Sequence, residues 1–181
     1  MNKNGLWFFI ACELGMAPAL AAQETATKML TLTMKVVEVT CQVNGGQGLS
    51  QQVVIPQVTV DALKAGNGVS AEAHLQVDCN GSRDQPEGIT LSFEPAGGSS
   101  LLGDGSRGML KTDREGVALA LTWKYDGTPV SLLPEGRHFM PTMSAGGIWD
   151  LSVVARPVAV SGEALSGGRY TAGVRLTMRY T

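Results

Sequence analysis

The segment that decides the fold is YTAGVRLTMRYT, residues 170–181, at the C-terminal end of the sequence. Its residues alternate between two sets, which is the pattern of a β-strand with one buried face. One face carries Tyr170, Ala172, Val174, Leu176, Met178 and Tyr180, and the other carries Thr171, Gly173, Arg175, Thr177 and Arg179. A strand that ends at the last residue leaves no chain to pair with its free edge, and proteins normally cover exposed apolar edges. We therefore expect that the strand which should follow is missing from the fold.

A second alternating segment lies near the other end of the chain and changes phase. Its apolar residues are first Leu30, Leu32, Met34 and Val36, at even positions, and then Val37, Val39, Cys41 and Val43, at odd positions. A shift of one residue moves the apolar set to the opposite face of a strand. The change indicates either a bulge in one strand or two strands that abut. In the second interpretation residues 25–36 belong elsewhere and the domain begins near residue 37.

Short strands separated by turn-rich stretches fill the region between these ends. The expected buried-face residues are Leu75, Val77 and Cys79, then Ile89, Leu91 and Phe93, then Trp149, Leu151, Val153 and Ala155 before Pro157 ends the run. Residues 117–125 (VALALTWKY) are apolar on both faces, which predicts a central strand, and residues 59–66 could hold one helical turn at most. This spacing predicts an all-β fold, an immunoglobulin-like β-sandwich that lacks its last strand.

The first 22 residues have the organisation of a secretory signal peptide. Lys3 precedes an apolar run at residues 6–12, and Ala19-Leu20-Ala21 gives a small-x-small cleavage pattern, with cleavage after Ala21 or Ala22. The apolar run is much shorter than the ~20 residues that span a membrane. We therefore expect an exported mature chain that is not inserted in a membrane.

The cysteines agree with export. Of three cysteines, Cys12 lies in the predicted signal peptide and leaves Cys41 and Cys79, which are 38 residues apart. An even number of cysteines in an oxidising compartment predicts one disulfide. Two cysteines without further ligands nearby do not make a zinc site, and the spacing is not that of a redox CxxC motif.

Taken in this order, the features resemble a pilin subunit of the chaperone–usher pathway, of the type 1 or P pilus kind. The segment VVEVTCQVNGGQ (36–47) resembles the first strand of that family, and HLQVDC (74–79) resembles the strand with the second cysteine. At the C-terminus, Tyr180 is penultimate, Gly168 is the fourteenth residue from the end, and Tyr170 follows two residues later. These positions resemble the strand that the pilus chaperone recognises.

The resemblance implies a division into a signal peptide (1–22), a donor-strand extension (23–36) and a pilin domain (37–181). A periplasmic chaperone would lend a strand to the open fold, and at the outer-membrane usher the extension of a neighbouring pilin would replace it. The implied donor residues are Leu30, Leu32, Met34 and Val36, and the implied chaperone-binding edge carries Gly168, Tyr170, Val174, Leu176, Met178 and Tyr180. The implied location is a fimbrium at the bacterial surface, reached through the periplasm.

One position departs from the family pattern. Families of this kind usually place glycine seven residues before the first cysteine, to fit a shallow pocket, and this chain has Met34 there. Either the neighbouring subunit is specialised or the segment donates less tightly. This favours a minor or adaptor subunit over the main rod subunit.

Composition and motifs do not favour other functions. With 14 basic and 16 acidic residues the net charge is -2, which predicts no nucleic-acid partner. His74 and His138 have no catalytic context, no GxSxG turn is present, and the Gly-rich loops lack P-loop or EF-hand spacing, so we predict neither an enzyme, a cofactor nor a metal site. Trp123 and Tyr125 could line a sugar site, but Trp123 shares a face with Leu119 and Leu121, which favours the core.

The prediction is therefore a structural fimbrial subunit that polymerises by strand exchange and supports cell adhesion. The alternative is a single-domain fimbrial tip adhesin that binds a host glycan. A secreted β-sandwich enzyme is a third reading, for which the sequence offers no catalytic constellation.

Overall fold

One layer of the fold is a long antiparallel arrangement of short strands. The computed structural model describes residues 41–83, 85–140 and 146–181. Five strands pair in the order β2 (Ala71–Ala73), β10 (Val153–Ala159), β7 (Val117–Trp123), β6 (Met109–Lys111) and β5 (Ser100–Leu101). Three more pair in the order β1 (Gln42–Val43), β3 (Gln76–Asp78) and β9 (Ile148–Asp150).

A buried serine joins these two groups of strands into one layer. Between β9 and β10, Ser152 is only 1% exposed, and its Oγ accepts a hydrogen bond of 3.1 Å from the Leu75 amide. Beside it, the Leu151 amide donates to the Leu75 carbonyl at 2.7 Å. The chain thus passes from β2 to β3 and from β9 to β10 with its buried polar groups satisfied, as a buried backbone requires.

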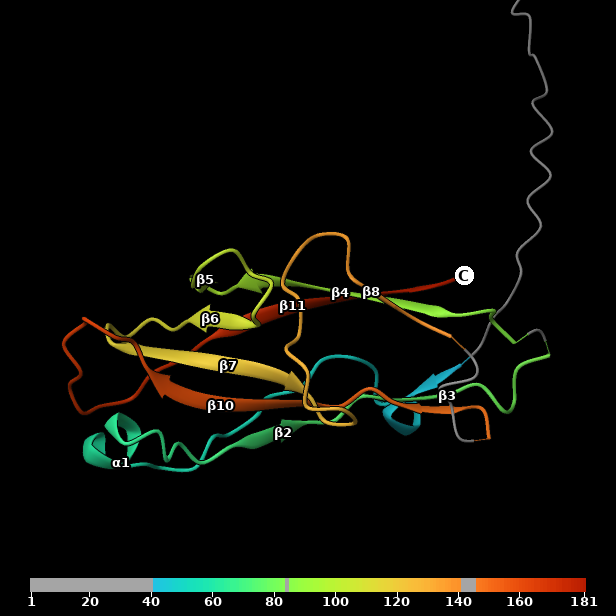
Figure 1. Cartoon of the computed structure of the whole chain (residues 1–181). Coiled ribbons are helices and arrows are strands. Elements are labelled where there is room, and N and C mark those ends of the chain that lie inside the picture. The colour runs from blue at the N-terminus through green and yellow to red at the C-terminus, as the bar shows by residue number, and fades with distance from the viewer. Residues whose placement is uncertain (1–40, 84, 141–145) are drawn as a thin grey trace, which may run out of the picture. The chain divides into compact units, whose positions relative to one another are not determined.

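The second layer has three antiparallel strands and contains the C-terminal segment. Its order is β11 (Gly173–Tyr180), β4 (Ile89–Ala96) and β8 (Arg137–Phe139). In Figure 1 β4 and β11 run side by side above the layer formed by β7, β10 and β2. The predicted all-β fold is confirmed, and the predicted central strand is β7, which pairs with β10 on one side and β6 on the other.

The core lies between the layers and is formed by the residues that alternation placed on the buried faces. Ile89, Leu91 and Phe93 of β4 are at most 6% exposed, and Val77 and Cys79 are fully buried. Trp123 is 1% exposed and packs edge-to-face on Phe139, with 5.0 Å between ring centroids. Trp123 is therefore a core residue, and its ring is not available to line a sugar site.

The predicted single helical turn is present. Helix α1 (Val60–Lys64) begins after Thr59, whose hydroxyl accepts a hydrogen bond of 3.1 Å from the Ala62 amide. A 3-10 turn, η1 (Asn44–Gly46), follows β1, and Gly45 within it has a left-handed backbone with φ of 63°. The Asn-Gly pair in the sequence explains this turn, because both residue types tolerate positive φ.

Pro157 lies inside β10, so the prediction that it ends this strand is wrong. It pairs with Leu119 of β7, whereas the pairing of β10 with β2 stops at Ala155. The Pro157 carbonyl faces Gly68 on the side away from β7, where a Cβ on Gly68 would come within 2.1 Å of the oxygen. The nitrogen of Pro157 points to that same side, so its missing N–H interrupts no ladder.

The predicted disulfide joins Cys41 and Cys79 and links the start of the described chain to the end of β3. Val43 of β1 pairs with Val77 of β3 two residues away from each cysteine. The bond therefore closes a loop of 38 residues at a point where only two residue pairs hold β1 in the layer.

We expect the Cys41→Ser/Cys79→Ser double variant to lose about 2–5 kcal/mol of unfolding free energy, because the cross-link constrains the unfolded chain. Urea unfolding of the exported chain, with and without reductant, measures this loss. Reductant should change the wild-type midpoint and leave that of the double variant unchanged. A wild-type midpoint that does not respond to full reduction would contradict the expectation.

Candidate functional site

One edge of β11 has no partner strand among the described residues. Gly173–Tyr180 pair with β4 from Ala96 back to Ile89, and within residues 41–83, 85–140 and 146–181 no second strand pairs with β11. Beyond the strand, Thr181 and Gly88 exchange two hydrogen bonds of 3.0 Å, one in each direction. In an antiparallel ladder such pairs alternate. The odd-numbered residues of β11 therefore direct their amides and carbonyls toward β4, and the even-numbered ones direct theirs toward the open edge.

The residues with outward-facing backbone groups also carry the apolar side chains. Val174, Leu176, Met178 and Tyr180 are half-buried and pack against the core cluster. Arg175 and Arg179 are exposed on the other face of the strand. The open edge thus combines a row of backbone donors and acceptors that have no partner in the described part of the chain with apolar side chains that are only partly covered.

Apolar residues that follow β1 reach the same core without belonging to a strand. Leu49 and Ile55 are half-buried against the core cluster, whereas Val54 between them is 81% exposed. The side chain of Gln51, rather than its backbone, pairs with the backbone of His74. Its Oε1 accepts from the His74 amide at 3.1 Å, and its Nε2 donates to the His74 carbonyl at 2.7 Å. No described strand pairs with the backbone of residues 49–58.

The turn between β6 and β7 holds the connection that leads from β10 into β11. The Asp113 carboxylate accepts hydrogen bonds from the Thr171 amide at 2.6 Å and the Thr171 hydroxyl at 2.7 Å. The Asp113 amide donates to the Thr171 carbonyl at 3.0 Å. At the next step along the chain, the Gly173 amide donates to Ser99 Oγ at 2.9 Å. The first residues of the edge strand are thus fixed from two different loops.

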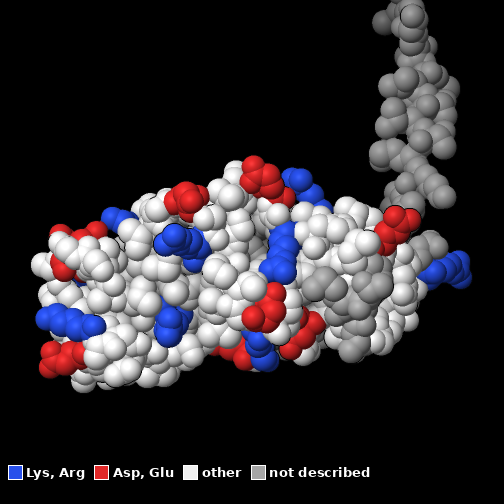
Figure 2. All heavy atoms as spheres, viewed as in Figure 1, with Lys and Arg blue, Asp and Glu red and all other residues white. Residues whose placement is uncertain are grey.

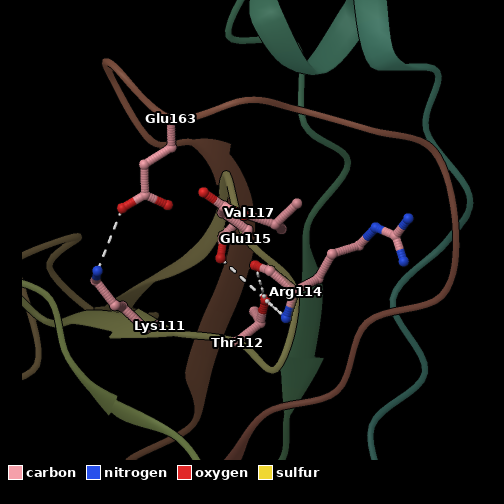
Figure 3. Close-up of a pocket in the computed structure, with 6 residues that line it drawn as sticks. All are labelled: Lys111, Thr112, Arg114, Glu115, Val117 and Glu163. Atoms are coloured by element: carbon pink, nitrogen blue, oxygen red, sulfur yellow. Dashed lines mark hydrogen bonds and ion pairs between the residues drawn. The ribbon is translucent and has the colours of Figure 1, made fainter.

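A pocket beside this turn is lined by Lys111, Thr112, Arg114, Glu115, Val117 and Glu163 (Figure 3). Two of its charged side chains bind each other: the Glu163 carboxylate accepts from Lys111 Nζ at 3.2 Å, and it also accepts from the Gly116 amide at 2.9 Å. The Gly116 hydrogen bond, followed by that of Lys111, lowers the pKa of Glu163. We interpret these contacts as structural, because they fasten the loop after β10 to the β6–β7 turn.

The face of the molecule shown in Figure 2 gives little indication of a charged ligand. On the face shown in Figure 2, acidic and basic side chains are interspersed and neither sign forms an extended patch. Among the described residues, no group of His, Cys, Asp and Glu is arranged to hold a metal ion. In the part of the chain that the structure describes, no helix has the length and hydropathy needed to cross a membrane.

The predicted site residues fall into three groups. Val174, Leu176, Met178 and Tyr180 lie together on β11, as the alternation indicates. Gly168 and Tyr170 precede this strand, which begins at Gly173, although Tyr170 also packs against the core. The predicted donor residues Leu30, Leu32, Met34 and Val36 lie outside the described residues.

The sequence analysis did not predict three residues that contact β11 or the segment leading into it. Ser99, Asp113 and Arg114 contact the segment that leads into β11 from 52 to 74 residues away. A turn sequence such as TDREG (112–116) predicts only a connection between two strands. Nothing local in it specifies which distant loop its side chains will contact.

Comparison with known proteins identifies the family. The family model described as fimbrial protein matches residues 30–181. The chain belongs to the fimbrial protein family. This family is structural and not a family of enzymes, and the predicted pilin resemblance is confirmed. A fimbrial subunit is located in a surface fimbria and is exported through the periplasm.

Solved structures show that the fold is that of pilus subunits. The crystal structure of the P pilus rod subunit PapA matches with a TM-score of 0.53 and 17% identity, over 78% of this chain and 99% of that one. A chaperone-usher pilus, studied for the uncoiling of its rod, matches with a TM-score of 0.55 and 17% identity, over 87% of this fimbrial chain and 97% of that one. No curated protein matches the sequence significantly.

The Asp113–Thr171 contact predicts that the folding stability of this fimbrial protein decreases in acid. The two hydrogen bonds from Thr171 hold the pKa of Asp113 below its ordinary value of 3.8. A carboxyl group whose pKa is lowered by folding stabilises the folded state at pH values above its ordinary pKa. This contribution is lost as the pH falls through the lower pKa of the folded state.

We expect Asp113→Asn to be less stable than wild type at neutral pH and to lose less of its stability on acidification. Unfolding free energies measured between about pH 2 and pH 6 test this, since linkage gives the slope directly. Asp61→Asn on α1 is the matched control, because Asp61 lies outside this contact. Parallel pH curves for wild type and Asp113→Asn would show that the contact does not contribute.

Proposed function

We propose that this fimbrial protein is a structural subunit of a chaperone–usher fimbria and polymerises by donor-strand exchange. The observation that carries the proposal is the open edge of β11, where Val174, Leu176, Met178 and Tyr180 present unpaired backbone groups beside half-buried apolar side chains. An added strand would satisfy both needs at once, because its backbone would pair with β11 while its alternate side chains would cover the core.

The energetic scale supports a stable, non-covalent fibre. Four buried donor side chains at about 1.5–3 kcal/mol each would contribute about 6–12 kcal/mol before ordering costs. This range is comparable to the whole free energy of unfolding of a typical domain. Leu30, Leu32, Met34 and Val36 of a neighbouring copy or another pilin have the spacing of such a donor.

The partners of the proposed pathway follow from the same edge. Until a neighbouring subunit supplies its strand, the edge would be an aggregation hazard in the periplasm. A periplasmic chaperone that lends a strand would remove this hazard, and the outer-membrane usher would be the place where one strand replaces the other. The finished fimbria would support cell adhesion.

We propose further that the chain is a minor or adaptor subunit. Met34 occupies the position where the family resemblance implies glycine. A long, flexible side chain needs a deeper pocket than glycine does, so the acceptor of this donor segment must differ from the common one. A specialised neighbour is the simplest source of such an acceptor.

Two forms of the domain test strand addition. The first comprises residues 37–181, and the second carries residues 23–36 after Thr181 through a short flexible linker. We expect the first to aggregate or melt early and the second to be monomeric, with a melting temperature higher by about 10 °C or more. A first form that is already stable and monomeric would contradict strand addition.

Matched substitutions in the appended segment test its register. Leu32→Asp should abolish the gain in melting temperature, because Leu32 lies on the apolar set, whereas Thr33→Asp on the opposite set should retain most of it. An equal effect of the two substitutions would show that the appended segment does not bind as an alternating strand.

A third substitution tests the assignment as a minor subunit. If Met34 suits a specialised neighbour, Met34→Gly in the appended segment should fit this chain's own edge better and raise the melting temperature. The Leu30→Gly control should lower it, because it removes apolar burial without relieving a clash. A Met34→Gly form that melts lower than its parent would show that Met34 fits this chain's own edge, and would contradict the assignment as a minor subunit.

A further inference from the structure

The guanidinium of Arg114 binds the loop that precedes β11 rather than a carboxylate. It donates to Ser166 O at 3.1 Å, to Ser166 Oγ at 3.0 Å and to the carbonyls of Gly167 and Arg169. Figure 3 shows the side chain pointing away from Glu163 toward this loop. Among the described residues no ion pair involves Arg114. The Arg114 guanidinium therefore binds several hydrogen-bond acceptors from residues 166–169.

Gly168 makes room for this guanidinium. A Cβ on Gly168 would lie 2.6–2.7 Å from three of its atoms, closer than real side chains approach. The backbone of Gly168 also has φ of 144°, a conformation that residues with a Cβ rarely adopt. With the guanidinium in this position, a side chain at residue 168 would have to displace it.

The position of this contact links it to the open edge. Residues 160–172 form a long connection between β10 and β11 without a strand or helix of its own. On entering β11 the chain is paired with β4 on one side only. Arg114 holds the loop at residues 166–169 and Asp113 holds Thr171, so consecutive residues of one turn fix the start of the one-sided strand.

We infer that Arg114 is a positioning residue for the acceptor edge, and that Gly168 is glycine in order to admit its guanidinium. This inference rests on the proposed function, because ordering the edge is useful only if a strand binds there. An edge that is already ordered loses less conformational entropy when the strand binds. A glycine that sequence resemblance assigned to chaperone recognition thus has a role inside the subunit itself.

A double-mutant cycle on the exported chain tests the contact. Gly168→Ala in the wild-type background must displace the guanidinium, whereas in the Arg114→Ala background this conflict is absent. We expect the folding equilibrium constant to fall about fivefold more in the first case than in the second. Gly162→Ala is the matched control, because Gly162 lies in the same loop with φ of 82° and has open space around it. Equal effects of Gly168→Ala in both backgrounds would overturn the assignment of Gly168.

Hydrogen exchange reports on the edge directly. We expect the amides of Thr171 and Gly173 to exchange about tenfold faster or more in Arg114→Ala, because charge-assisted hydrogen bonds that order the loop are lost. Arg114→Lys should recover little of this protection, since a lysine ammonium cannot reproduce the planar fork. Arg156→Ala is the control, because Arg156 is exposed and its side chain makes no hydrogen bond or ion pair among the described residues. Unchanged exchange in Arg114→Ala would overturn the positioning role.

Binding of a synthetic peptide of residues 23–36 separates this inference from the proposed function. We expect Arg114→Ala to bind it about tenfold more weakly than wild type, through loss of preorganisation. Val130→Ala, which lowers stability from within the core, should bind it as wild type does. Peptide that binds wild type and Arg114→Ala equally would reject the role of Arg114 and leave strand addition intact. Peptide that binds no variant, combined with faster exchange in Arg114→Ala, would reject self-donation and retain Arg114 as the residue that orders the edge.

Discussion

Among the described residues β11 pairs with β4 alone, and this pairing settles which groups of β11 remain available to a partner. The ladder directs the odd-numbered amides of β11 into the sheet, so Val174, Leu176, Met178 and Tyr180 must direct theirs outward. The pleat turns the side chains of these same residues toward the core. The residues whose backbone groups lack partners in the described part of the chain are therefore also the ones whose side chains are only half-buried.

The opposite layer contains a strand with extensive pairing and burial. Its central strand β7 is buried along most of its length and is paired on both sides. The turn before β7 carries Asp113 and Arg114, so a strand that is paired on both sides directly follows the turn that holds the segment before β11. The disulfide has a comparable role at the other end, where β1 is held by only two residue pairs.

Features with a local repeat were predictable from the sequence. Alternation placed Ile89, Leu91 and Phe93 in the core, and the cysteine count predicted the Cys41–Cys79 disulfide. The prediction that Pro157 ends its strand was wrong, because the cost of a missing N–H depends on whether a neighbour occupies that side. The loop contacts of Arg114 were not predictable either, since they join residues more than 50 positions apart.

By itself, the sequence determined that the fold is all-β and which side of each strand faces the core, because side-chain direction repeats every two residues along a single strand. It also indicated an alternating apolar strand within residues 170–181. Only the tertiary structure decided which backbone edge is open, which loop holds it, and why residue 168 must be glycine. Hydrogen-bond partners in a sheet come from distant segments, and their choice depends on how the two layers pack.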